Sequence, residues 1–154
     1  MEFRVLPAHA PERTQLARWY HAQWGQAVGI SLDDEQARLE RAPDAEGFPL
    51  LVGAFEGGPL VGGAQIKRRE MPAFPQHEYW LSSVYVADSH RGRGLASHLV
   101  EHLAAQALQK GVRELYLQTE SLDGGLYARL GWQPICEADS HGYHVLVMVR
   151  RLHA

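Results

Sequence analysis

Cysteine is almost absent from this 154-residue chain: Cys136 is the only one, so no internal disulfide can form. A long apolar run is also missing, because residues 48–55 are interrupted by Pro49 and Gly53 and fall short of the roughly 20 residues that cross a bilayer. The first four residues lack the charged and apolar regions of a signal peptide. These absences predict a cytoplasmic protein with no membrane partner.

The sequence has no large excess of one charge. Its 15 lysines and arginines against 18 aspartates and glutamates give a net charge of −3, with a pI near 6.3. That balance provides no general attraction to nucleic acid. The 45% of hydrophobic residues is typical of a globular protein, and a chain of this length buries roughly two-thirds of its unfolded surface in one core. We therefore expect residues 1–154 to form a single domain.

Hydrophobic periodicity, prolines and glycines predict a mixed α/β fold. Two helices precede most of the strands, and the paired Gly57 and Gly58 suit a hairpin turn. The predicted elements, in chain order, are a strand at 3–6, helices at 11–25 and 31–42, strands at 49–56, 59–69 and 78–86, a helix at 95–110, a strand at 112–119, a helix at 123–130, and strands at 133–137 and 143–149.

A glycine-rich turn at Arg91–Ala96 lies between a strand and a strongly amphipathic helix. Glycines allow a tight turn and a close approach to a ligand, and the free N–H groups at a helix start favour an anion. The order strand, turn, helix, strand is that of a crossover joining two parallel strands. The turn therefore predicts a diphosphate site beside a parallel pair.

Three interpretations of the turn remain open from these residues. A dinucleotide site would use Gly92, Gly94 and an acid such as Glu120, but Ser97 stands where its third glycine belongs. A tight turn with no ligand is the second interpretation. A site for another diphosphate cofactor is the third.

Two motifs favour the third interpretation through a family resemblance. Arg91–Ala96 resembles the Arg/Gln-x-x-Gly-x-Gly/Ala signature of the GNAT superfamily of acetyl-CoA-dependent N-acetyltransferases, and Val84–Val86 resembles its central strand. Tyr127–Trp132 is similar to the Tyr-x-x-Leu-Gly-Phe/Trp segment of the same family, at the expected spacing. The resemblance implies a mixed, mostly antiparallel sheet with flanking helices and a central parallel pair splayed around CoA.

The resemblance also implies acetyl-CoA as the acetyl-donor cosubstrate and no metal. Backbone N–H groups and arginines of the turn would hold its pyrophosphate, and the central strand would pair with pantetheine. The cofactor-binding residues expected in this way are Val84, Tyr85, Val86, Arg91, Gly92, Arg93, Gly94, Leu95, Ala96 and Ser97.

For catalysis the resemblance implies direct acetyl transfer to a primary amine of a small molecule or peptide. Tyr127 is expected to act as the general acid that protonates the departing thiolate. The general base is either Glu78 or Glu120, and Glu120 stands where the family often has asparagine. A non-catalytic acyl-CoA-binding or regulatory module is the alternative. Exposed strand edges would allow a homodimer.

Other features could contribute to an acceptor site or to packing alone. The aromatic residues near Trp19 and Trp24 and the loop at 71–77 come from regions that border the acceptor in similar folds. The basic run 67–69 could attract an acidic acceptor or could be a solvated face. The five residues 98–102 fit the inverted zinc-protease pattern His-x-x-Glu-His, with solvated helix-edge histidines as the alternative.

Overall fold

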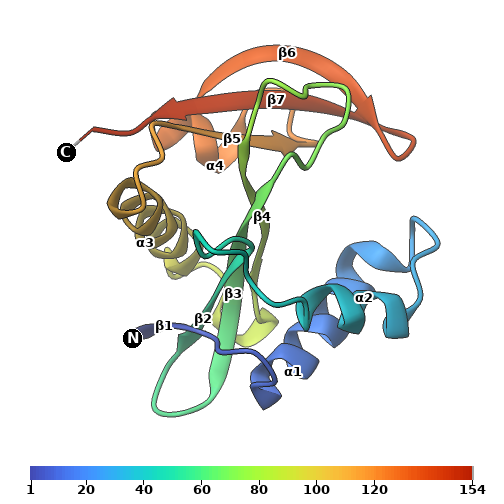
Figure 1. The fold of residues 1–154 in the computed structure, drawn as a ribbon, viewed down its shortest axis with the longest axis vertical. Helices are drawn as coiled ribbons and strands as arrows, with labels where there is room; N and C mark the ends of the chain where they lie inside the picture. The colour runs from blue at the N-terminus through green and yellow to red at the C-terminus, as the bar shows by residue number, and fades with distance from the viewer. Residues whose placement is uncertain (154) are drawn as a thin grey trace.

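A seven-stranded sheet organises the fold, with its strands in the order β1-β2-β3-β4-β5-β7-β6 (Figure 1). The computed structural model describes residues 1–153. Its elements are β1 (Glu2–Val5), α1 (Pro11–Tyr20), the π-helix η1 (His21–Gly25), α2 (Leu32–Leu39), β2 (Leu50–Phe55), β3 (Leu60–Arg68), β4 (Tyr79–Val86), the 3-10 helix η2 (Asp88–His90), α3 (Leu95–Gln109), β5 (Glu114–Thr119), α4 (Gly125–Arg129), β6 (Gln133–Ser140) and β7 (Tyr143–Arg151).

The predicted order of helices and strands is confirmed throughout. Pro11 begins α1, where its missing N–H costs no helical hydrogen bond, and Ser31 caps α2 by accepting a hydrogen bond from the Asp34 N–H at 3.0 Å. The first helix changes to a π-helical turn after Tyr20 before it ends at Gly25. β6 continues three residues past its predicted end, because its outer residues are polar and hide the strand pattern.

The mixed sheet with one central parallel pair is also as predicted. All other neighbouring strands are antiparallel, whereas β4 and β5 are parallel and share only the register pair Trp80 and Tyr116. On its other side β4 has an irregular register with β3, and Ser83 adopts a φ of 56° there. This left-handed backbone at a bulge bends the strand and increases its twist. The two parallel strands therefore separate beyond Trp80.

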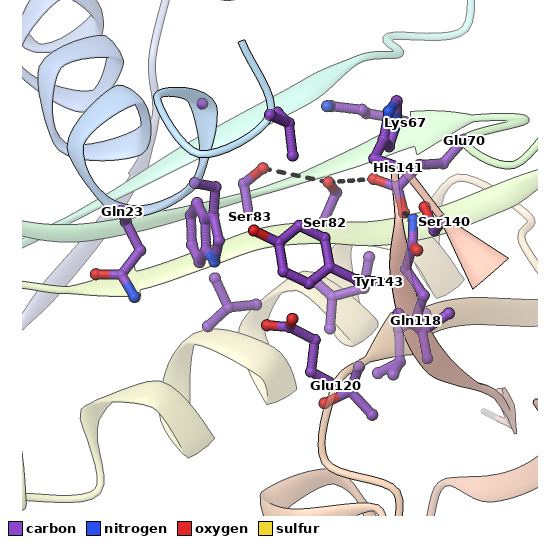
Figure 2. Close-up of a pocket in the computed structure, with 18 of the residues that line it drawn as sticks. Gln23, Lys67, Glu70, Ser82, Ser83, Gln118, Glu120, Ser140, His141 and Tyr143 are labelled. Atoms are coloured by element: carbon purple, nitrogen blue, oxygen red, sulfur yellow. Dashed lines mark hydrogen bonds between the residues drawn. The ribbon is translucent and has the colours of Figure 1, made fainter. Parts of the chain in front are cut away.

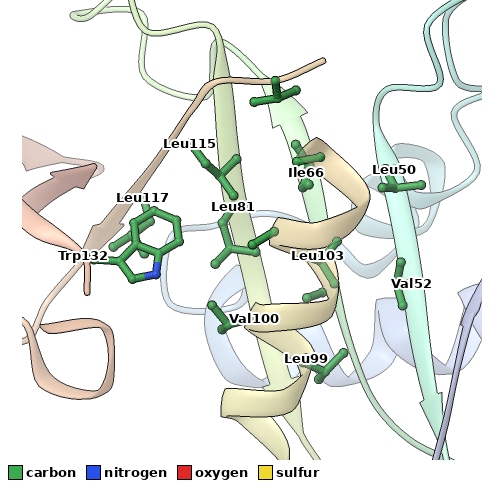
Figure 3. Packing of buried hydrophobic residues seen from close by; sticks show 14 of the residues in the cluster. Leu50, Val52, Ile66, Leu81, Leu99, Val100, Leu103, Leu115, Leu117 and Trp132 are labelled. Carbon is green, nitrogen blue, oxygen red and sulfur yellow. The ribbon is translucent and has the colours of Figure 1, made fainter. Parts of the chain in front are cut away.

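The helices cover both faces of the sheet and form separate parts of the core (Figure 1). On one face, Leu99, Val100 and Leu103 of α3 are fully buried against the strands, as Figure 3 shows. On the other face, α1 packs Leu16 and Tyr20 against β2. No helix among residues 1–153 is long and apolar enough to span a membrane.

Candidate active site

A cleft of about 740 Å³ lies where β4 and β5 separate. Its walls come from η1 and the segment that follows, α2, the end of β3, the two separating strands, α4 and the β6–β7 hairpin. Figure 2 shows side chains from these elements pointing into the same space. Segments distant in sequence are thus brought together at the one parallel junction of the sheet.

The cleft is lined from both faces of the sheet. Leu117 and Gln118 are consecutive residues of β5, and both line it. Because successive side chains of a strand point to opposite faces, one of them faces the α3 side and the other the α1 and α2 side. Leu117 belongs to the core packed against α3, so Gln118 faces the other side. Two molecules can therefore meet in this cleft from opposite faces.

The glycine-rich turn leads into α3 with an open surface. Gly92 and Gly94 have φ values of 80° and 76°, and a Cβ on either would meet no other atom within 4 Å. Gly94 is the N-cap of α3 and provides no side-chain cap, so the first N–H groups of the helix have no partner from the cap. An anion can approach this backbone closely, as a diphosphate requires.

The two arginines of the turn are held by neighbours. Arg91 donates from Nε to the Val86 carbonyl at 2.8 Å and pairs with Asp88 at 2.7 Å. Arg93 lies 3.4 Å from Glu56, beside a hollow of about 190 Å³ that Leu95 also lines. Both arginines of the turn are therefore paired with a carboxylate, Arg91 with Asp88 and Arg93 with Glu56.

The three residues of β4 that were predicted to bind the cofactor lie in different environments. Val84 lines the cleft, and Val86 is buried in the core against α3. Tyr85 faces the opposite side, where its ring stacks on Trp19 at 5.2 Å between centroids and lies edge-on to Trp24 at 6.2 Å. Trp19 therefore packs against the strand, whereas Trp24 is 37% exposed and lines the cleft.

Tyr127 lines the cleft from α4. Its ring is half-buried and lies edge-on to Trp132, with the centroids 6.1 Å apart. Burial disfavours the charged phenolate and raises the pKa of Tyr127 to about 12. The phenol consequently keeps its proton at neutral pH and can donate it to a group in the cleft.

The two carboxylates predicted as bases lie in different places. Glu120 is exposed and lines the cleft. Glu78 does not line it, and its oxygens pair with Arg68 at 2.7 Å and Arg69 at 2.9 Å. The structure therefore brings Tyr127 and Glu120 to the same cleft and keeps Glu78 outside it.

The basic run 67–69 and the histidines of α3, which the sequence also suggested as site residues, lie partly in the cleft and partly outside it. Lys67 lines the cleft, whereas Arg68 is held in ion pairs. His98 is exposed on α3, and His102 packs beside Phe3, where burial lowers its pKa. Within residues 1–153 no group of three His, Cys, Asp or Glu side chains is arranged to hold a metal ion.

Three cleft residues carry no recognisable sequence signal. Glu70, Ser82 and Gln118 line the cleft and form one hydrogen-bonded group. Ser82 Oγ donates to Glu70 Oε1, and Gln118 Nε2 donates to Glu70 Oε2 at 3.0 Å. Their separation in sequence hides this group, and Glu70 begins a segment that the sequence marks only as a loop.

The β6–β7 hairpin closes one side of the cleft. Ser140 pairs with Tyr143 across a two-residue turn, in which His141 and Gly142 have φ values of 49° and 84°. Positive φ at both positions matches the twist of the two strands. The turn places Ser140, His141 and Tyr143 along the cleft, and the Tyr143 ring is 40% exposed there (Figure 2).

Comparisons with known proteins agree with this geometry. The sequence model of the Acetyltransferase (GNAT) family matches residues 13–132. No curated protein sequence matches the chain. The structure of aminoglycoside 6′-acetyltransferase type Ii is similar, with a TM-score of 0.77 at 20% identity over 100% of this chain and 99% of that one.

Two further solved structures share the fold. Aminoglycoside 6′-N-acetyltransferase complexed with coenzyme A gives a TM-score of 0.78 at 16% identity, over 100% of this chain and 98% of that one. The protein yncA of Salmonella typhimurium, solved with its cofactor acetyl-CoA, gives 0.69 at 19% identity, over 100% and 95% of the two chains. At such identities the likeness is one of fold.

Proposed function

Because the chain belongs to the GNAT acetyltransferase family, we propose that it transfers an acetyl group from acetyl-CoA directly to a primary amine of a small molecule or peptide. The observation that carries this proposal is the cleft between β4 and β5, which is lined from both faces of the sheet. Acetyl donor and amine acceptor can reach the same point from opposite sides without an acetylated enzyme.

The residues around the turn fit the diphosphate of acetyl-CoA. Open space around Gly92 and Gly94 and the uncapped start of α3 allow backbone N–H groups to contact it. Arg91 and Arg93 belong to the same turn, and their guanidinium groups would hold the diphosphate in place of the carboxylates of Asp88 and Glu56. When bound, acetyl-CoA supplies an activated acetyl thioester. The part of β4 from Val84 to Val86 has no register partner in β5, and we assign the rest of the cofactor to this edge of the strand.

The reaction needs two proton transfers, and we assign one to Tyr127 and the other to a carboxylate of the cleft. Tyr127 Oη donates its proton to the departing sulfur, since its raised pKa keeps the phenol protonated until the thiolate needs a proton. An attacking amine must be neutral, so a carboxylate has to take a proton from the ammonium form. Of the two predicted bases, Glu120 lines the cleft and Glu78 is neutralised by arginines. We assign to an N–H of β4 the stabilisation of the charge that develops on the carbonyl oxygen.

A thiol-release assay over a panel of primary amines tests this function. The panel contains glycinamide, spermidine, glucosamine and a tripeptide with a free N-terminus, each mixed with acetyl-CoA and the wild-type protein. We expect release of free thiol with at least one amine, and a lower kcat for Tyr127→Phe at unchanged acetyl-CoA affinity. Affinity for acetyl-CoA without turnover of any amine would favour a non-catalytic acyl-CoA-binding module. Failure to bind CoA would contradict both functions.

A further inference from the structure

The Glu70 carboxylate occupies the point at which the parallel strands separate. Trp80 of β4 and Tyr116 of β5 form the single register pair between these strands. Ser82 and Gln118 each lie two residues farther along, and residues two apart in a strand share a face. At this next position the Glu70 carboxylate bridges the strands, because one oxygen accepts from Ser82 and the other from Gln118.

The backbone before Glu70 directs its side chain toward the cleft. Arg69 has a φ of 48°, a left-handed conformation that a non-glycine residue keeps only where its surroundings hold it. Its N–H donates to the Glu78 carbonyl at 2.7 Å, which fixes the turn at the end of β3. Ser82 and Ser83 are also hydrogen-bonded, at 3.2 Å between hydroxyls (Figure 2).

The charge of Glu70 is not neutralised by a cation. Its partners, Ser82 and Gln118, are neutral donors, and the ion pairs found among residues 1–153 do not include Glu70. Glu78 shows the contrast, since two arginines hold it. Glu70 is half-buried, so part of its hydration is also lost. A carboxylate that is fixed by neutral donors and faces a cleft attracts a cationic group.

From these contacts we infer that Glu70 binds the ammonium group of the acceptor and takes its proton, with Ser82 and Gln118 as positioning residues. This inference rests on the proposed function and assigns the base role to Glu70 in preference to Glu120. Glu120 is exposed, and no side chain among the described residues fixes its carboxylate by a hydrogen bond. Only Glu70 has both an orientation and a place at the strand separation.

The proton and bond changes balance. One N–H proton of the acceptor ammonium passes to a Glu70 oxygen, and the freed nitrogen lone pair forms the C–N bond with the acetyl carbonyl carbon. The C–S bond breaks, and the sulfur leaves with its electron pair and takes the Tyr127 proton. The new amide nitrogen loses its second proton, which restores Tyr127, and Glu70 returns its proton to solvent. The sum is an ammonium ion and a thioester giving an amide, a thiol and one proton.

Glu70→Gln tests the inference, with Glu114→Gln as the control, because Glu114 is an exposed glutamate of β5 outside the cleft. The acceptors are the best amine of the panel, which is cationic at neutral pH, and hydroxylamine, which is neutral there. For Glu70→Gln we expect kcat/KM with the cationic amine to fall about 100-fold or more, the usual size of a general-base effect. Hydroxylamine needs no initial deprotonation, so its rate should change little in either variant.

The positioning residues give a second readout. Gln118→Leu removes one donor, so it should lower the rate with the cationic amine while leaving hydroxylamine and the KM for acetyl-CoA unchanged. A merely structural role of Gln118 would affect both acceptors equally.

A spectroscopic measurement is independent of turnover. In protein labelled with ¹³C at glutamate carboxyl groups, the Glu70 signal is identified by its absence from Glu70→Gln. With CoA present in place of acetyl-CoA, addition of the panel amine should shift the Glu70 signal and leave the Glu78 signal unmoved. A shift confined to Glu120 would overturn the inference.

The outcomes separate this inference from the proposed function. Wild-type turnover with an unchanged rate for Glu70→Gln on the cationic amine overturns the role of Glu70 and leaves acetyl transfer intact. A loss of equal size with hydroxylamine also overturns it, because the variant has then lost something other than deprotonation. A wild type that releases thiol with no amine in the panel overturns both proposals.

Discussion

At the scale of single residues, Tyr127 in the cleft makes the stability of the protein depend on pH. Its pKa is raised to about 12 from an ordinary 10.0, so the folded protein keeps a proton that the unfolded chain releases in this range. The stabilisation from this group is complete below pH 10 and is lost as the pH rises toward 12. We expect Tyr127→Phe to lose less stability than the wild type between pH 9 and pH 11, measured by urea unfolding.

The control for this prediction is the pair of tyrosines whose pKa values are also raised by burial, Tyr20 and Tyr116. Both remain in Tyr127→Phe, so they contribute equally to the two proteins. Identical alkaline losses in wild type and variant would show that the Tyr127 phenol is not desolvated in solution.

A substitution of Gly94 tests whether the glycine-rich turn binds the diphosphate of CoA. Gly94→Asp places a negative charge at the start of α3, in a backbone conformation with φ of 76°, and should weaken CoA binding strongly. Gly111→Asp is the matched control, because Gly111 has a φ of 89° and similarly open surroundings at the other end of α3. Calorimetric titration with CoA should show a loss for Gly94→Asp alone, and equal affinities would contradict the diphosphate site.

At the scale of elements, α3 carries the largest part of the core. Leu103 is fully buried between this helix and the sheet (Figure 3). Leu103→Ala should lower the free energy of unfolding by about 2–5 kcal/mol, since it removes buried methyl groups and leaves a cavity. The exposed Ala105 is on the same helix, and Ala105→Ser should change the free energy of unfolding by less than about 1 kcal/mol. Urea unfolding of both variants measures the difference, and similar losses would mean that helix propensity outweighs packing.

Elements also show which predictions follow from local sequence. Pro11, Ser31 and the stripe of leucines on α3 act through contacts within a few residues, so they mark helices before any tertiary structure is known. The bulge at Ser83 does not follow from local sequence, because an apolar strand run gives no sign of where its pairing becomes irregular. That bulge separates β4 from β5, and the cleft depends on it.

At the scale of the whole molecule, Arg68 joins segments far apart in sequence. It pairs with Asp44 at 2.7 Å, Glu46 at 2.8 Å and Glu78 at 2.7 Å. The hydrogen bond from Arg68 is the main cause that lowers the pKa of Asp44 below its ordinary 3.8. A carboxylate whose pKa is lowered by folding stabilises the protein above pH 3.8. This stabilisation is lost as the pH falls through the pKa of the carboxylate in the folded protein.

Arg68→Met should therefore weaken the acid dependence of the melting temperature. We expect the difference in Tm between pH 7 and pH 3 to be smaller in this variant than in the wild type. Arg69→Met serves as control, because within residues 1–153 the ion pair of Arg69 is with Glu78 and not with Asp44, so this variant should retain the wild-type difference. A wild-type pH dependence in Arg68→Met would show that these exposed pairs contribute nothing in solution.

The sequence by itself determined the order of helices and strands and the glycine-rich turn, because each depends on neighbours within one turn or one strand. Only the tertiary structure decided which acidic residues line the cleft. Glu78 lies outside it, in ion pairs with Arg68 and Arg69, whereas Glu70 lies between the separated strands. The physical reason is that the contacts of Glu70 join residues 48 apart in sequence, and only the sheet fixes such distances.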